Sequence, residues 1–97
     1  MFDQMKKLME MKQQADKIKR DLEAKRVEMS EVDGIRIVVD GAQKFHEVEI
    51  DERFLVPQEK KNLEKELLRS LNKAMAKSQS LAADQMKQLF GSGMPGL

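Results

Sequence analysis

The sequence contains no Cys, Trp or Tyr, and only one His and two Pro among its 97 residues. The absence of Cys excludes disulfides, Cys-ligated metal sites and thiol nucleophiles, and it fits a reducing compartment such as the cytoplasm. Four Phe are the only aromatic residues, and 36% of the residues are charged, so a large spherical core is not expected. We therefore predict one elongated, helix-rich domain that needs a partner chain.

Long apolar runs are also lacking. Residues 1–7 contain no apolar stretch of signal-peptide length, and runs such as Ile37-Val38-Val39 stop at three residues. We therefore expect neither secretion nor a membrane partner.

Residues suited to catalysis are scarce. His46 is the only His, so neither a His-based metal cluster nor a catalytic triad can form, and the five Gly make no phosphate-binding loop. Glu47, Glu49 and Asp51 share one face of a predicted strand and indicate a solvated surface, with His46 as a surface or half-buried packing residue. We predict no enzyme, no metal, no cofactor and no small-molecule substrate.

Two long amphipathic segments are present instead. Residues 2–29 contain no Gly or Pro, and their apolar residues recur at a spacing of three and four, which predicts a helix. Its apolar stripe comprises Met1, Leu8, Met11, Ala15, Ile18, Leu22 and Met29. Pro57 suits the first turn of a second helix that continues to about Phe90. The second apolar face comprises Leu63, Leu67, Leu71, Ala74, Met75, Ser78, Ala82, Met86 and Leu89.

The segment between the helices has the two-residue period of strands. Residues 35–40 and 45–50 alternate in this way, and Asp40-Gly41-Ala42-Gln43 supplies a turn because Gly and Asp tolerate positive φ. A short strand over residues 27–32, with a turn at Asp33-Gly34, competes with the first helix. The predicted fold class is α+β: a long N-terminal helix, a small antiparallel sheet of two to three strands and a long C-terminal helix. We expect residues 1–90 to form one domain, and residues 91–97 a flexible Gly/Pro tail.

The net charge of +1 hides an uneven distribution. Residues 1–26 carry a net charge of +3, residues 27–59 of −6, residues 60–66 of +1 and residues 67–97 of +3. Both ends are therefore basic, and the middle is acidic.

Basic residues follow one flank of each predicted helix. Lys12, Lys19 and Arg26 recur every seventh residue beside the first apolar stripe. In the second helix the basic residues recur every fourth residue, as Lys61, Lys65, Arg69, Lys73 and Lys77. One such run usually marks a solvated face. Two runs beside an acidic middle support a solvated face and a polyanion partner equally well. Phosphate contact needs only such side chains, whereas we identify no residues that would read base edges.

Several segments also occur in a characteristic order. They are Met9, Met11 and Lys12-Gln13-Gln14; Ile37-Val38-Val39-Asp40-Gly41; Val48-Glu49-Ile50-Asp51 followed by Leu55; Leu67-Leu68; Leu71-Asn72-Lys73-Ala74; and the tail from Gly91 to Leu97. In this order and spacing, nearly the whole chain resembles the YbaB/EbfC family of bacterial nucleoid-associated DNA-binding proteins. A departure lies at residues 30–34, where many relatives have a longer Gly-rich stretch. The resemblance implies a tweezer-like homodimer with a joined sheet and helical arms, which binds DNA with little or no sequence preference.

We therefore expect a cytoplasmic, nucleoid-associated homodimer that binds double-stranded DNA through its basic helical arms. The candidate DNA-binding residues are Lys6, Lys7, Lys12, Lys19, Arg20, Arg69, Lys73, Lys77 and Lys87. The first helix enters the sheet and the second leaves it, so the basic residues of the two helices should meet at one end. This would place Lys6, Lys7 and Lys12 near Lys73, Lys77 and Lys87. The alternative is a prefoldin-like holder of unfolded or partner proteins, whose arms would present apolar tips.

Overall fold

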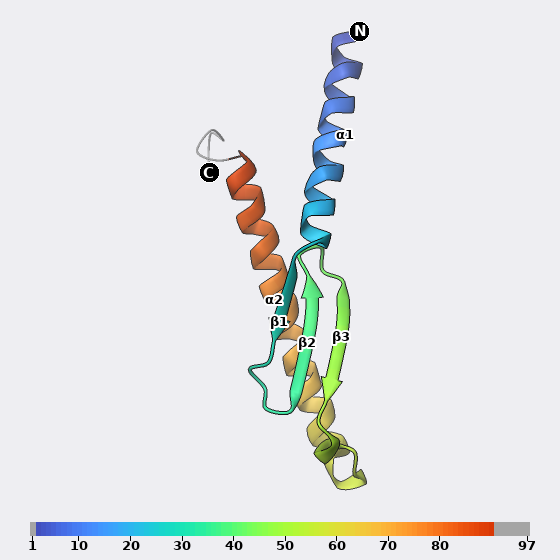
Figure 1. Cartoon of the computed structure of the whole chain (residues 1–97), viewed down its shortest axis with the longest axis vertical. Helices are drawn as coiled ribbons and strands as arrows, with labels where there is room; N and C mark the ends of the chain where they lie inside the picture. The colour runs from blue at the N-terminus through green and yellow to red at the C-terminus, as the bar shows by residue number, and fades with distance from the viewer. Residues whose placement is uncertain (1, 91–97) are drawn as a thin grey trace.

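The computed structural model describes residues 2–90, which form an elongated molecule of 66 × 25 × 18 Å (Figure 1). The elements in chain order are helix α1 (Phe2–Glu23), strands β1 (Arg26–Met29), β2 (Ile35–Asp40) and β3 (Phe45–Ile50), 3-10 helices η1 (Glu52–Phe54) and η2 (Pro57–Glu59), and helix α2 (Lys60–Phe90). The predicted α+β class is confirmed, and the sheet has three strands. The tail expected at residues 91–97 lies outside the described residues.

Helix α1 ends at Glu23 rather than at the predicted Met29. The residues that follow form β1, which pairs antiparallel with β2 from Arg26 opposite Asp40 to Met29 opposite Ile37. Met29 is completely buried in the core between the sheet and α2. The helix prediction was wrong here because Met29 matches the apolar spacing of α1, although its side chain is buried by the sheet. The short strand weighed against the helix is therefore present, with bounds of 26–29.

The three strands form an antiparallel meander in the order β1-β2-β3. At the turn between β2 and β3, the left-handed residue is Gln43, with φ of 67°. The expectation of positive φ at Gly or Asp is therefore wrong for this turn. Gly41 is needed for a different reason, since a Cβ at this position would lie 3.0 Å from the backbone oxygen of Leu22. At the other turn Gly34 does adopt positive φ, at 87°.

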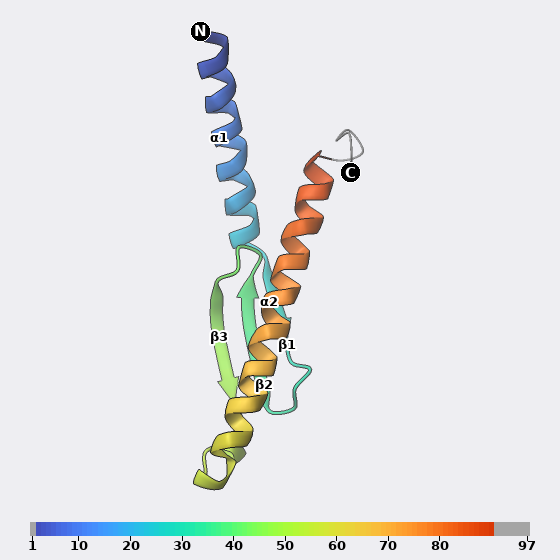
Figure 2. The same ribbon diagram turned by 180° about the vertical axis from the view of Figure 1, so that it is seen from behind.

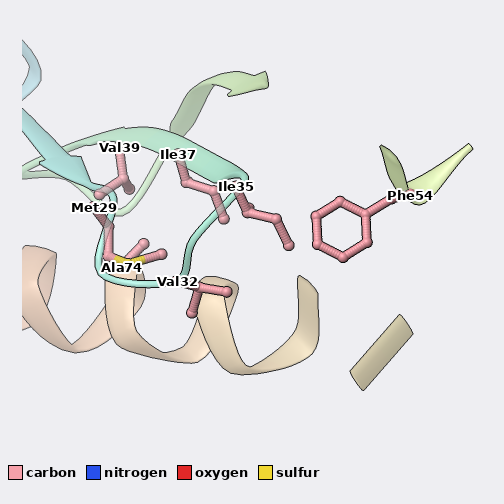
Figure 3. Close-up of a cluster of buried hydrophobic side chains, with 7 residues drawn as sticks. All are labelled: Met29, Val32, Ile35, Ile37, Val39, Phe54 and Ala74. Atoms are coloured by element: carbon pink, nitrogen blue, oxygen red, sulfur yellow. The ribbon is translucent and has the colours of Figure 1, made fainter. Parts of the chain in front are cut away.

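Helix α2 crosses one face of the sheet, and the main core lies between them (Figures 1 and 2). Figure 3 shows its buried side chains, which are Met29, Val32, Ile35, Ile37, Val39, Phe54 and Ala74. Small residues let the helix approach the strands closely, because Ser70, Ala74 and Ser78 are fully buried at a spacing of four residues. The Ser70 hydroxyl donates to the Glu66 carbonyl oxygen at 2.8 Å, which satisfies a polar group in the interface.

The opposite face of the sheet is polar. Arg36 Nε donates to Glu28 Oε1 at 2.9 Å, and its Nη1 lies 3.1 Å from Glu47 Oε2 and 3.5 Å from Glu49 Oε1. All four side chains are at least a third exposed to solvent. The solvated surface predicted for Glu47 and Glu49 is confirmed, while Asp51 lies just beyond the end of β3.

Candidate nucleic-acid interface

Helix α1 forms an arm that projects beyond the sheet. Apart from half-buried Ile18 and buried Leu22, every residue of this helix is exposed. Large apolar side chains with exposures between 63% and 88% are Phe2, Met5, Leu8, Met9 and Met11. Figure 1 shows α1 and α2 separating above the sheet, and these exposures show that no other described residue covers the N-terminal part of α1.

The candidate basic residues of α1 lie exposed on this arm: Lys6, Lys7, Lys12, Lys19 and Arg20. Among residues 2–90, no carboxylate lies within ion-pair distance of these five side chains. Arg20 Nε donates to the carbonyl oxygen of Asp16 at 3.4 Å. Lys12 and Lys19 are two helical turns apart, about 10.5 Å along the axis, so they form a row. These cations remain available to an external anion.

The candidate basic residues of α2 have different surroundings. Lys73 Nζ lies 3.1 Å from Glu31 Oε2, and Lys77 Nζ lies 3.1 Å from Glu31 Oε1. Arg69 Nη1 lies 3.6 Å from Glu66 Oε2. The hydrogen bonds from Lys73 and then Lys77 are the main cause that lowers the pKa of the Glu31 carboxyl below its ordinary value. The middle of α2 is therefore partly neutralised by the protein's own carboxylates.

The structure does not bring all the candidate residues together. The start of α1 and the end of α2 do point in the same direction, as expected (Figure 1). Exposed Lys87 belongs to the last turn of α2. Lys73 and Lys77, however, lie beside the segment between β1 and β2. Their expected proximity to the tip of α1 is wrong because this part of α2 is still packed on the sheet, as buried Ala74 and Ser78 show.

The base of the α1 arm is held by the turn between β2 and β3. The backbone N–H of Gly41 donates to the Leu22 carbonyl oxygen at 2.9 Å and to that of Lys25 at 3.2 Å. Buried Ser78 on α2 donates its hydroxyl to the Asp40 carbonyl oxygen at 2.7 Å and accepts from the Gln43 N–H at 3.1 Å. One turn thus links the end of α1 to the middle of α2.

The buried Asp40 carboxylate stabilises this turn by accepting hydrogen bonds. It accepts hydrogen bonds from the backbone N–H groups of Ala42 at 2.8 Å and Lys44 at 3.0 Å, and from His46 Nε2 at 2.8 Å. Burial raises the pKa of the Asp40 carboxyl, but these hydrogen bonds together bring that pKa below its ordinary value. His46 is exposed on β3, in agreement with the surface position predicted for it, and its ring bonds to the Asp40 carboxylate. The sequence identifies Asp40 only as a turn residue, because its partners are brought to it by tertiary contacts.

Acidic residues gather towards the end of the molecule opposite the tip of α1. A hollow of about 470 Å³ there is lined by Glu31, Asp33, Arg53, Glu59, Glu66 and Arg69, among others. Its arginines already face carboxylates, since Arg53 Nη1 lies 3.1 Å from Asp33 Oδ2. These carboxylates would weaken phosphate binding here, which leaves the arm as the better candidate surface.

The part of the chain that the structure describes offers neither a metal site nor a membrane span. Within residues 2–90, no group of three or more His, Asp or Glu side chains is arranged to hold a metal ion. Neither helix in this range is both long and apolar enough to cross a membrane.

The protein is thus a small, elongated α+β protein whose exposed helical arm carries five candidate cations without carboxylate partners among residues 2–90, an arrangement suited to a polyanion. The family model of the YbaB/EbfC DNA-binding family matches residues 1–94. The chain therefore belongs to this family, which confirms the resemblance seen in the sequence. It is a family of nucleoid-associated DNA-binding proteins rather than a class of enzymes.

Two relatives agree with this assignment. A nucleoid-associated protein of Ruminiclostridium cellulolyticum is 31% identical over 96 residues, which cover 96% of this chain and 84% of that protein. A nucleoid-associated protein of Syntrophobacter fumaroxidans is 28% identical over 98 residues, which cover 99% of this chain and 89% of that protein.

Proposed function

We propose that this protein binds double-stranded DNA with little sequence preference, as a homodimer whose basic arms contact the phosphates. The row of exposed α1 cations without carboxylate partners among the described residues carries the proposal. The contacts would come first from Lys6, Lys7, Lys12, Lys19, Arg20 and Lys87, with Arg69, Lys73 and Lys77 as a second group on α2. We place the protein in the cytoplasm, on the nucleoid, where it would influence nucleoid organisation and gene expression. The names of both relatives support this location.

Low sequence preference follows from the chemistry of the arm. Lysine is a flexible point charge that suits phosphate oxygens, whereas base edges are read by arginine, asparagine and glutamine in fixed bidentate geometry. The arm residues proposed to contact DNA are four lysines and one arginine. The family match also favours DNA over the prefoldin-like alternative.

A competition experiment tests the proposal directly. Two unrelated duplexes of equal length should compete for the full-length protein with affinities within about tenfold of each other, well below the 10³–10⁷ of specific binders. The measurement is displacement of a labelled duplex, followed by fluorescence anisotropy. Discrimination by several orders of magnitude would contradict phosphate contact as the main interaction.

The dimer in this proposal is supported by the apolar side chains of α1. Burying one leucine contributes about 1.5–3 kcal/mol, and α1 leaves several large apolar side chains in water in the single protomer. Most of the stability of a helix in a protein comes from tertiary packing of its apolar face, which the N-terminal part of α1 lacks here. A second copy of the chain that packed on these apolar side chains would bury them and stabilise α1. The basic flank of α1 would remain accessible beside that contact.

Sedimentation equilibrium at micromolar concentration is expected to give about twice 11.2 kDa. A Leu8→Glu variant should shift the protein towards monomer, because it would place a charge in the covered stripe. Leu55→Glu is a matched control, since Leu8 and Leu55 are 65% and 68% exposed and only Leu8 lies on α1. A folded wild-type monomer at all concentrations would refute the dimer.

A further inference from the structure

Glu31 makes a contact that the proposed function does not explain. It lies in the segment between β1 and β2, which passes beside the middle of α2 (Figure 2). Its two carboxylate oxygens each lie 3.1 Å from a lysine ammonium, one from Lys73 and the other from Lys77. The two lysines are one helical turn apart, so their side chains are neighbours on one face of α2.

We propose that Lys73 and Lys77 form a phosphate-binding site that Glu31 occupies in the free protein, so that Glu31 competes directly with DNA. This inference rests on the proposed function. A phosphodiester carries one negative charge shared by two non-bridging oxygens, just as the Glu31 carboxylate carries one negative charge shared by its two oxygens. It can therefore accept hydrogen bonds from the same two ammonium groups in a similar arrangement.

The Glu31 contact is exposed enough for exchange. The side chains of Glu31, Lys73 and Lys77 are 52%, 39% and 38% exposed. Exposed ion pairs contribute little to stability because water and salt screen them. A duplex phosphate that arrives with the other contacts of the arms can thus displace the carboxylate without unfolding the loop.

Glu31 differs from the other carboxylates that pair with basic residues of α2. Glu64 and Glu66 belong to α2 itself, and they pair with Lys60 and Arg69 within about one turn of the helix. Glu31 comes from a separate segment and reaches two lysines that flank buried Ala74. It is therefore the carboxylate whose removal would uncover two cations at once while leaving the charges within α2 unchanged.

The test compares Glu31→Gln with Glu52→Gln in the full-length protein, using one random-sequence duplex at 0.1 M salt. Both changes remove one negative charge, but Glu52 lies in η1 and has no ion pair among the described residues. Because an exposed pair is weak and each dimer carries two copies of it, Glu31→Gln should bind about fivefold more tightly than wild type. Glu52→Gln should change the affinity less than twofold, and thermal melting should show that both variants are folded.

A second background separates the local contact from a general charge effect. In a Lys73→Gln/Lys77→Gln protein, Glu31→Gln should give no more gain than Glu52→Gln, because the two ammonium groups are absent. A gain that persists in this background, or no gain in the wild-type background, would overturn the inference while leaving DNA binding intact. Failure of the wild-type protein to bind any duplex would instead refute the proposed function, and this inference with it.

Discussion

Replacing Lys6, Lys12 and Lys19 together with Gln is expected to lower the affinity for duplex DNA by more than about a hundredfold at 0.1 M salt. Each lysine that contacts a phosphate releases nearly one counterion from the DNA, and in a dimer these three positions would neutralise up to six phosphates. Lys and Gln have similar helix propensities, and all three positions are exposed, so the fold should persist. Fluorescence anisotropy with a random duplex measures the decrease in affinity.

The matched control for this variant replaces Lys44, Lys61 and Lys65 with Gln. It removes the same charge from exposed positions outside α1. We expect the affinity to fall by less than about tenfold, since none of these residues lies on α1 and they act on DNA through a screened field. Equal decreases in the two variants would show that net charge decides binding, and would remove α1 from the interface.

The affinity of the wild-type protein for DNA is expected to fall by about a thousandfold between 50 and 200 mM salt. If the two arms neutralise about six phosphates, counterion release gives a slope near −5 for the logarithm of affinity against the logarithm of salt concentration. Titrations at four or more salt concentrations measure this slope.

The slope also tests where the phosphates bind. The variant at Lys6, Lys12 and Lys19 should show a shallower slope than wild type, by about 0.9 for each phosphate that it no longer neutralises. The control variant should keep the wild-type slope. A salt-independent affinity would contradict the phosphate mechanism and would favour the apolar, prefoldin-like mode of binding.

The elements of the fold were predictable from the sequence where local pattern and tertiary burial agree. The spacing of Leu63, Leu67 and Leu71 predicts the helix that packs on the sheet, and the alternation over residues 35–40 predicts the central strand. Prediction failed at Met29, because a residue with suitable helical spacing was buried by a strand. A period alone cannot show which element buries a residue.

The candidate interface was less predictable than the fold. The exposure of the α1 lysines follows from an amphipathic pattern, so Lys12 and Lys19 could be chosen from the sequence. Glu31 could not, because 42 residues separate it from Lys73 and only the packing of α2 on the sheet brings the two together. Local charge patterns therefore identify cations, whereas the structure shows which of them already have an anion beside them.

The hydrogen bonds from Gly41 to the end of α1 fix the angle at which the α1 arm leaves the sheet. The arm beyond this point is about 33 Å long, so a rotation of about 10° at the turn would carry its tip roughly 6 Å, nearly two base-pair steps along a duplex. Small errors at the base would thus become large errors in where Lys6 meets DNA. The hydrogen bonds of Asp40 and Ser78 are therefore placed where angular accuracy has the greatest effect on the tip of the arm.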